Sequence, residues 1–141
     1  MHRYQNVISC TGVEAVPVSN ADMVGTQLTY HLLNAELSGT SGVVADYVVL
    51  PPGFVHGTHR HPKADQVLIP LEGPPFEFSV DDQVSVVNVG EIGVARRNRW
   101  HRLANRSDEP IRAIVLFLGV STIADAGYES AADRELSAPG T

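Results

Sequence analysis

The amino-acid sequence predicts an all-β protein of one domain, folded as a sandwich or barrel of short strands. Ten short apolar segments follow one another along the first 118 residues, and residues typical of tight turns separate nearly every pair. Twelve Gly and nine Pro in 141 residues mean frequent turns, which favour many short strands over long helices. A chain of this length suits one domain and can bury a hydrophobic core.

The clearest predicted strand covers residues 43–50, where Val, Tyr and Leu dominate and the run Pro51-Pro52-Gly53 closes it. Thr29 and Tyr30 give β character to the segment 28–33. Turn residues at 72–75, 81–82, 88–90 and 107–110 separate the later segments. The ten predicted strands are residues 13–18, 28–33, 43–50, 55–61, 66–71, 76–80, 84–89, 92–95, 100–104 and 111–118.

Composition and charge exclude several classes of function. The net charge of −6 argues against binding of nucleic acid, which needs a basic surface. No apolar run approaches the roughly 18 residues of a membrane span, and the N-terminus lacks the apolar stretch of a secretion signal, so we expect a cytoplasmic protein. Cys10 is the single cysteine, which excludes an internal disulfide and a thiol-based metal site.

Three histidines predict a metal site. His59 and His61 are separated by one residue, so on a strand they share one face at a spacing of roughly 6.6 Å. His101 lies on another predicted strand and provides a third imidazole. Two strands that meet inside a barrel can bring these rings onto one ion.

The two histidine segments resemble the motifs of the cupin superfamily. The first motif, Gly-x5-His-x-His-x(3,4)-Glu-x6-Gly, matches at Gly53, His59, His61 and Gly73. The second, Gly-x5-Pro-x-Gly-x2-His-x3-Asn, matches at Gly90, His101 and Asn105, while Arg96 and Asn98 stand where Pro and Gly are usual. The resemblance implies a double-stranded β-helix (jelly-roll) barrel over residues 1–118, with metal motifs at 53–73 and 90–105. It also implies one divalent metal ion (Zn, Fe, Ni, Mn or Cu) and a homodimer.

The sequence departs from the family at the position of the metal-binding carboxylate. Counting back from Gly73 places Gln66 there, and neutral donors would leave the ion its full positive charge and make it a stronger Lewis acid. Asp65 is the alternative ligand, because the motif allows three or four intervening residues and alternation points only one of the two inward. A site of three histidines without a fourth protein ligand is also open.

Four further features are interpreted from the sequence, three of them in more than one way. His56 lies on the opposite face from His59 by simple alternation, unless Gly57 introduces a bulge that turns it inward. His31 either lines the same lumen or is a core or interface residue. Asn105 is expected to support a turn through side-chain hydrogen bonds. Six arginines between residues 96 and 112 either clamp an anionic substrate or form a solvated surface that pairs with acidic residues, and the second is favoured.

The residues after 118 differ from the rest, since Ala, Ser, Asp and Glu dominate. We expect residues 119–141 to form one short helix around 129–136 or else to remain loose. A flexible or partner-packed terminus is favoured over a lid on the site.

The leading functional hypothesis is an enzyme that acts on a small molecule with one metal ion as Lewis acid. The ligands would be His59, His61, Gln66 and His101, and Asp65 or His56 would be the catalytic proton shuttle. The reaction would be a non-oxidative cyclisation, isomerisation or lyase step on a carbonyl compound. The alternatives are an Fe(II) dioxygenase with the same ligands and a non-catalytic sensor or binding barrel.

Overall fold

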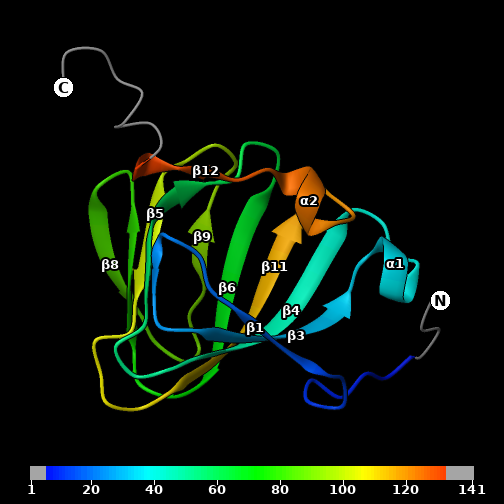
Figure 1. Cartoon of the computed structure of the whole chain (residues 1–141), viewed down its shortest axis with the longest axis horizontal. Helices are drawn as coiled ribbons and strands as arrows, with labels where there is room; N and C mark the ends of the chain where they lie inside the picture. Colours follow the sequence, from blue (N-terminus) through cyan, green and yellow to red (C-terminus); the bar gives the residue numbers. More distant parts are fainter. Residues whose placement is uncertain (1–5, 133–141) are drawn as a thin grey trace.

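The computed structural model, whose residues 6–132 are described, is a barrel of two facing antiparallel β-sheets (Figure 1). One sheet has the strand order β1-β3-β4-β11-β6-β9 and the other the order β12-β5-β10-β7-β8, with β2 paired to β5. The first sheet consists of β1 (Ala15–Val18), β3 (Gln27–Leu33), β4 (Val43–Leu50), β11 (Ile111–Leu118), β6 (Asp65–Glu72) and β9 (Gly93–Ala95). The second consists of β2 (Met23–Val24), β5 (Val55–Arg60), β7 (Phe76–Val80), β8 (Gln83–Val87), β10 (His101–Ala104) and β12 (Glu129–Ser130).

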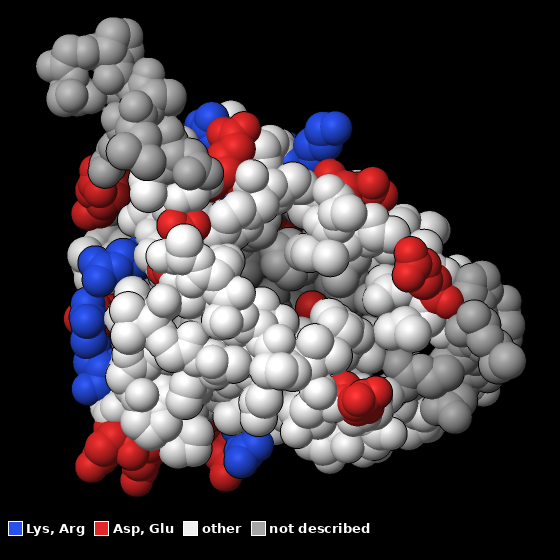
Figure 2. All heavy atoms as spheres, in the orientation of Figure 1, with Lys and Arg blue, Asp and Glu red and all other residues white. Residues whose placement is uncertain are grey.

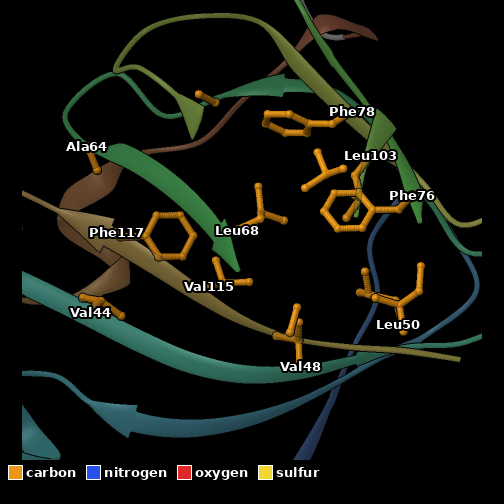
Figure 3. Close-up of a cluster of buried hydrophobic side chains, with 14 of the residues drawn as sticks. Val44, Val48, Leu50, Ala64, Leu68, Phe76, Phe78, Leu103, Val115 and Phe117 are labelled. Carbon is orange, nitrogen blue, oxygen red and sulfur yellow. The ribbon is translucent and has the colours of Figure 1, made fainter. Parts of the chain in front are cut away.

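The core fills the space between the two sheets. Strand β11 shows why: its residues alternate between buried and half-buried positions, so that Ile111, Ala113, Val115 and Phe117 face inward. Figure 3 shows side chains of the first sheet, such as Val115 and Phe117, facing side chains of the second sheet, such as Phe78 and Leu103. The interior is apolar where the two sheets interdigitate.

The all-β prediction and the jelly-roll class are confirmed. Each of the ten predicted segments overlaps one strand, and three strands, β4, β7 and β11, have the predicted bounds. The strands β2 and β12 and the helices α1 (Ala35–Ser38) and α2 (Ile123–Ala126) were not predicted. These elements have two to four residues, too few for hydrophobic periodicity to show.

The residues after Leu118 pack on the barrel mouth as far as the structure describes them. Strand β12 lies beside β5 at this end of the barrel, and helix α2 lies near the ends of β11 and β4 (Figure 1). The helix predicted around 129–136 begins later than expected: Glu129 and Ser130 pair with Arg60 and His59 as strand β12, and Ala131 and Ala132 are helical. Residues 133–136 lie outside the described residues. No helix within residues 6–132 is long and apolar enough to cross a membrane.

Glycine is required at position 73, where φ is +114°. A Cβ atom there would lie 2.6 Å from the backbone oxygen of Pro110. The motif glycine therefore serves the close approach of two turns.

Asn105 joins the turn that follows β4 to its own turn after β10. Its side chain is fully buried, and Nδ2 donates to the backbone oxygens of Pro51 (3.1 Å) and Glu109 (2.9 Å) and more weakly to that of Leu50 (3.3 Å). Its Oδ1 accepts from the backbone N–H and the hydroxyl of Ser107. The expected turn-supporting role is confirmed.

We expect Asn105→Ala to lower the free energy of unfolding by about 2–4 kcal/mol, because several buried polar groups lose their partner at once. Urea denaturation followed by circular dichroism measures the loss. The matched control is Asn88→Ala, since Asn88 is exposed and its side chain donates to nearby Glu91. Its expected cost is within about 0.5 kcal/mol. Equal losses in the two variants would contradict this account of Asn105.

Candidate metal centre

Two neighbouring strands of the second sheet bring the three histidines together. Strands β5 and β10 pair antiparallel, with His101 directly opposite His59. His61 follows the end of β5 on the same face as His59. The ring nitrogens that could bind an ion all lie within 4.8 Å of one another, and the rings are 2–7 % exposed.

Backbone carbonyls fix the orientation of each imidazole. Nδ1 of His59 lies 2.7 Å from the Gly57 oxygen, Nδ1 of His61 lies 2.8 Å from the Gly127 oxygen, and Nδ1 of His101 lies 3.0 Å from the Arg99 oxygen. A carbonyl oxygen only accepts, so each Nδ1 carries the proton and donates. In the neutral ring Nε2 then holds the lone pair, which is the arrangement of metal-binding histidines.

Burial keeps these rings neutral. Desolvation lowers the pKa of His101 to about 4, and desolvation together with the neighbouring histidines lowers the pKa of His59 much further. Burial also lowers the pKa of His61. The three ligands are therefore unprotonated at pH 7, as metal binding requires.

Two buried polar atoms without a partner point to a missing positive group. Among residues 6–132, Nε2 of His101 and Oε1 of Gln66 are buried side-chain atoms that make no hydrogen bond. Such atoms are costly unless an ion or ligand satisfies them. Both belong to residues that line one cavity, so the donor set fits a divalent cation with three imidazoles and a neutral amide oxygen.

Alternation along β6 separates Gln66 from Asp65. Gln66 lines the cavity, whereas Asp65 points away from it and accepts a hydrogen bond from the backbone N–H of Arg97 at 2.8 Å. The Arg97 guanidinium lies 3.7 Å from the same carboxylate. The structure therefore does not bring Asp65 to the imidazoles, and its predicted roles as alternative ligand or proton shuttle do not fit this geometry.

A bulge in β5 turns His56 toward the site. His101 of β10 pairs with His59 of β5, and Leu103 pairs with His56. The second pair is two residues further along β10 but three residues back along β5, so β5 holds one extra residue there. His56 and His59 consequently lie on one side and stack with ring centroids 3.8 Å apart. Burial, followed by the nearby His101, lowers the pKa of His56 to about 4.

Tyr128 and Asp22 complete this side of the site, and the sequence did not indicate either. The Tyr128 hydroxyl lies 3.1 Å from Nε2 of His56 and donates to the Asp22 carboxylate. Its ring also stacks on His59 at 5.1 Å. Both residues are remote in sequence from the histidine motifs, and neither has a characteristic spacing that could have identified it.

The imidazoles line one end of a cavity of about 260 Å³ inside the barrel. Figure 2 shows the hollow near the middle of this face, with few charged side chains beside it. Apolar residues of both sheets form much of the wall. The lining residues are Val18, Asn20, Met23, Gln27, His31, Asp46, Val48, Leu50, His56, His59, His61, Gln66, Leu68, Phe78, His101, Leu103, Val115, Phe117 and Ile123.

His31 lies on the wall of this cavity with Asp46. Its Nδ1 is 2.9 Å from the Asp46 carboxylate. Burial raises the pKa of the Asp46 carboxyl above its ordinary value, although the hydrogen bond and charge of His31 oppose the rise. The sequence singled out His31 but not Asp46, which stands within an apolar strand.

The arginines of residues 96–112 do not line this cavity. Four of them form ion pairs with carboxylates at or near the surface. For these four arginines the structure agrees with the favoured prediction of a solvated surface that pairs with acidic residues. The pairs are Arg97–Asp65, Arg99–Asp81, Arg106–Glu77 and Arg112–Glu72.

Comparison with known proteins identifies the same fold. Residues 46–117 match the family model described as "Cupin domain". No curated protein has a sequence that matches this chain. A predicted oxalate decarboxylase from Thermotoga maritima superposes with a TM-score of 0.72 at 18 % identity, covering 81 % of this chain and 99 % of that one.

Two other solved structures are similar. An uncharacterised double-stranded β-helix protein from Klebsiella pneumoniae has a TM-score of 0.64 and 19 % identity, over 89 % of this chain and 96 % of that one. The polyketide cyclase RemF from Streptomyces resistomycificus has a TM-score of 0.69 and 18 % identity, over 81 % and 79 %. At these identities the similarity shows the fold.

Proposed function

The chain belongs to the cupin domain family, and on this premise we propose that it is an enzyme that uses one divalent metal ion for a non-oxidative conversion of a small carbonyl compound. The observation that carries the proposal is the set of three buried imidazoles whose Nδ1 atoms are committed to backbone carbonyls. His59, His61 and His101 hold the ion, and Gln66 is the fourth ligand. A polyketide cyclase is among the proteins of similar fold, which supports cyclisation as one form of the reaction.

The neutral donors favour Lewis-acid chemistry. When bound, a divalent ion polarises a carbonyl oxygen and stabilises negative charge that develops on it. Three neutral imidazoles and the Gln66 amide leave that ion its full charge, because none of the four donors is anionic. The same ligand set provides no general base, so another residue must move the proton.

The cavity wall selects for a small and largely uncharged molecule. A volume of about 260 Å³ holds a compact organic molecule, and apolar side chains such as Leu68, Val115 and Phe117 cover much of the wall. Such an apolar wall strengthens electrostatic interactions within the site. The substrate class we propose is therefore an enolisable carbonyl compound without a large charge.

Metal analysis of protein purified without a polyhistidine tag tests the proposal. We expect one divalent ion per chain and turnover that is the same in air and under anaerobic conditions. Oxygen uptake during turnover would support the Fe(II) dioxygenase instead. Binding of a small molecule without any conversion, by metal-loaded protein, would support the sensor or binding barrel.

Gln66→Leu tests the fourth ligand. We expect the affinity for Zn²⁺ to fall at least about tenfold, because one oxygen donor is lost while the three imidazoles remain. Competition with a chromophoric chelator measures the change. Gln27→Leu is the matched control, since Gln27 lines the same cavity but bonds to Thr29. If Gln66→Leu binds Zn²⁺ as tightly as the wild type, Gln66 is not a ligand and three histidines alone hold the ion.

The homodimer and the cytoplasmic location stay predictions. Sedimentation analysis of the purified chain tests the first.

A further inference from the structure

We propose that Asp46 and His31 form the acid–base pair of this cavity, in which Asp46 takes a proton from the substrate and His31 passes it to solvent. The inference rests on the proposed function and names the missing general base. It places that base on the sheet opposite the strands that carry the imidazoles.

Asp46 is a buried carboxylate in an apolar strand face. It is 7 % exposed, and its neighbours on the inner face of β4 are Val44 and Val48. Across the sheet it pairs in register with Val115 of β11. A carboxylate in such surroundings is costly to keep for stability alone, and buried titratable groups of this kind cluster at functional sites.

The pair has the layout of a proton relay. The Asp46 side chain is 10 % exposed, whereas that of His31 is 38 % exposed, and 2.9 Å separates His31 Nδ1 from Asp46 Oδ1. The inner member of the pair therefore faces the cavity, and the outer member reaches water. Burial also raises the basicity of the Asp46 carboxylate.

The sheet register places Asp46 away from the metal ligands but within the same cavity. On the inner face, Asp46, Val115 and Leu68 form one row across three strands, and Val44, Phe117 and Gln66 form the next row. Two strand spacings and two residues along the strand separate the Cα atoms of Asp46 and Gln66 by about 12 Å. Asp46 thus meets a different part of a small substrate from the part held at the imidazoles.

The proposed step balances as a simple proton transfer. The C–H bond beside the substrate carbonyl breaks, and an O–H bond forms on Asp46. The electron pair of the C–H bond moves into a C=C bond, and the negative charge moves to the carbonyl oxygen. The proton then returns to the substrate at another atom, or it leaves through His31 to water.

Deuterium exchange tests this step without knowledge of the natural substrate. The probes are cyclohexanone, 1-indanone and acetylacetone in D₂O with Zn²⁺-loaded protein, and NMR follows loss of the α-protons. We expect Asp46→Asn to slow the catalysed exchange by about 10²–10⁴-fold. We expect His31→Gln to slow it by a smaller factor. Both variants should retain one Zn²⁺ per chain.

Two control variants separate this inference from the proposed function. Asp65→Asn makes the same chemical change outside the cavity and should exchange at the wild-type rate. His101→Ala should lose both Zn²⁺ and exchange. The inference would be overturned if Asp46→Asn exchanged deuterium at the wild-type rate while His101→Ala lost catalysed exchange. The proposed function would then still hold. Exchange by wild-type protein no faster than by free Zn²⁺ would overturn the proposed function and the inference with it.

Thermal melting of the metal-free proteins is a second readout that needs no substrate. If the pair serves chemistry, replacing both residues with Leu should leave the melting temperature unchanged or raise it. The conservative Asp46→Asn should likewise fold and melt near the wild type. Strongly lowered melting of both variants would assign the pair a structural role and overturn the inference.

Discussion

His101→Ala is expected to lower the bound metal from one ion per chain to less than about a tenth of that, since a four-donor site loses one imidazole of three. His101 is directly opposite His59 across the strand pair, so no other side chain of β10 can take its place. Among the described residues, its Nε2 is one of two buried side-chain atoms that make no hydrogen bond, as the proposed metal donor requires. Activity should fall with metal content. Elemental analysis after dialysis against buffer containing trace Zn²⁺ measures the loss.

The matched control for this substitution is His31→Ala. His31 lines the same cavity, but its Nδ1 is paired with Asp46 and it lies on the other sheet. We expect this variant to keep one ion per chain. Full metal content and turnover in His101→Ala would contradict both the site and the mechanism.

The cluster of three buried histidines could be predicted because its signal is local. One intervening residue fixes His59 and His61 to one face of a strand, and the turn before His101 marks the start of another. The spacing to Gly73 favoured Gln66, but the variable gap after His61 left Asp65 open, because adjacent strand residues differ only in the face they occupy. The structure shows which of the two faces inward.

Other members of the site could not be predicted because their contacts are long-range. Tyr128 meets His56 and Asp22 through the path of residues 119–130 across the barrel mouth, and the scarcity of large apolar residues there suggested a loose tail. The Gly127 carbonyl that orients His61 carries no side-chain signal at all. Asp46 was overlooked because strand periodicity describes its position well and says nothing about chemistry.

Acid is expected to destabilise the metal-free protein strongly between pH 6.5 and pH 4. The imidazoles of His56 and His101 have folded-state pKa values of about 4, below the ordinary value of 6.5, mainly because burial penalises the charged ring. In this range the unfolded chain binds more protons than the folded chain, so the free energy of unfolding falls as the pH falls. One such imidazole lowers the free energy of unfolding by about 3 kcal/mol between neutral pH and pH 4. The coupled histidines together lower it by on the order of several kcal/mol. Urea denaturation at a series of pH values measures the slope.

A variant that removes titrating rings distinguishes this cause from general acid denaturation. In His59→Gln/His101→Gln, two of the desolvated imidazoles are gone, and His56 loses the neighbouring His101 charge that lowers its pKa. The pH slope of stability should therefore become much shallower between pH 6.5 and 4, while the carboxylates that titrate below pH 4 stay the same. An unchanged slope would show that the histidine cluster is not the acid-labile element. Under the proposed function the same neutral rings hold the ion, so acidification should release the metal over the same pH range in which the rings take up protons.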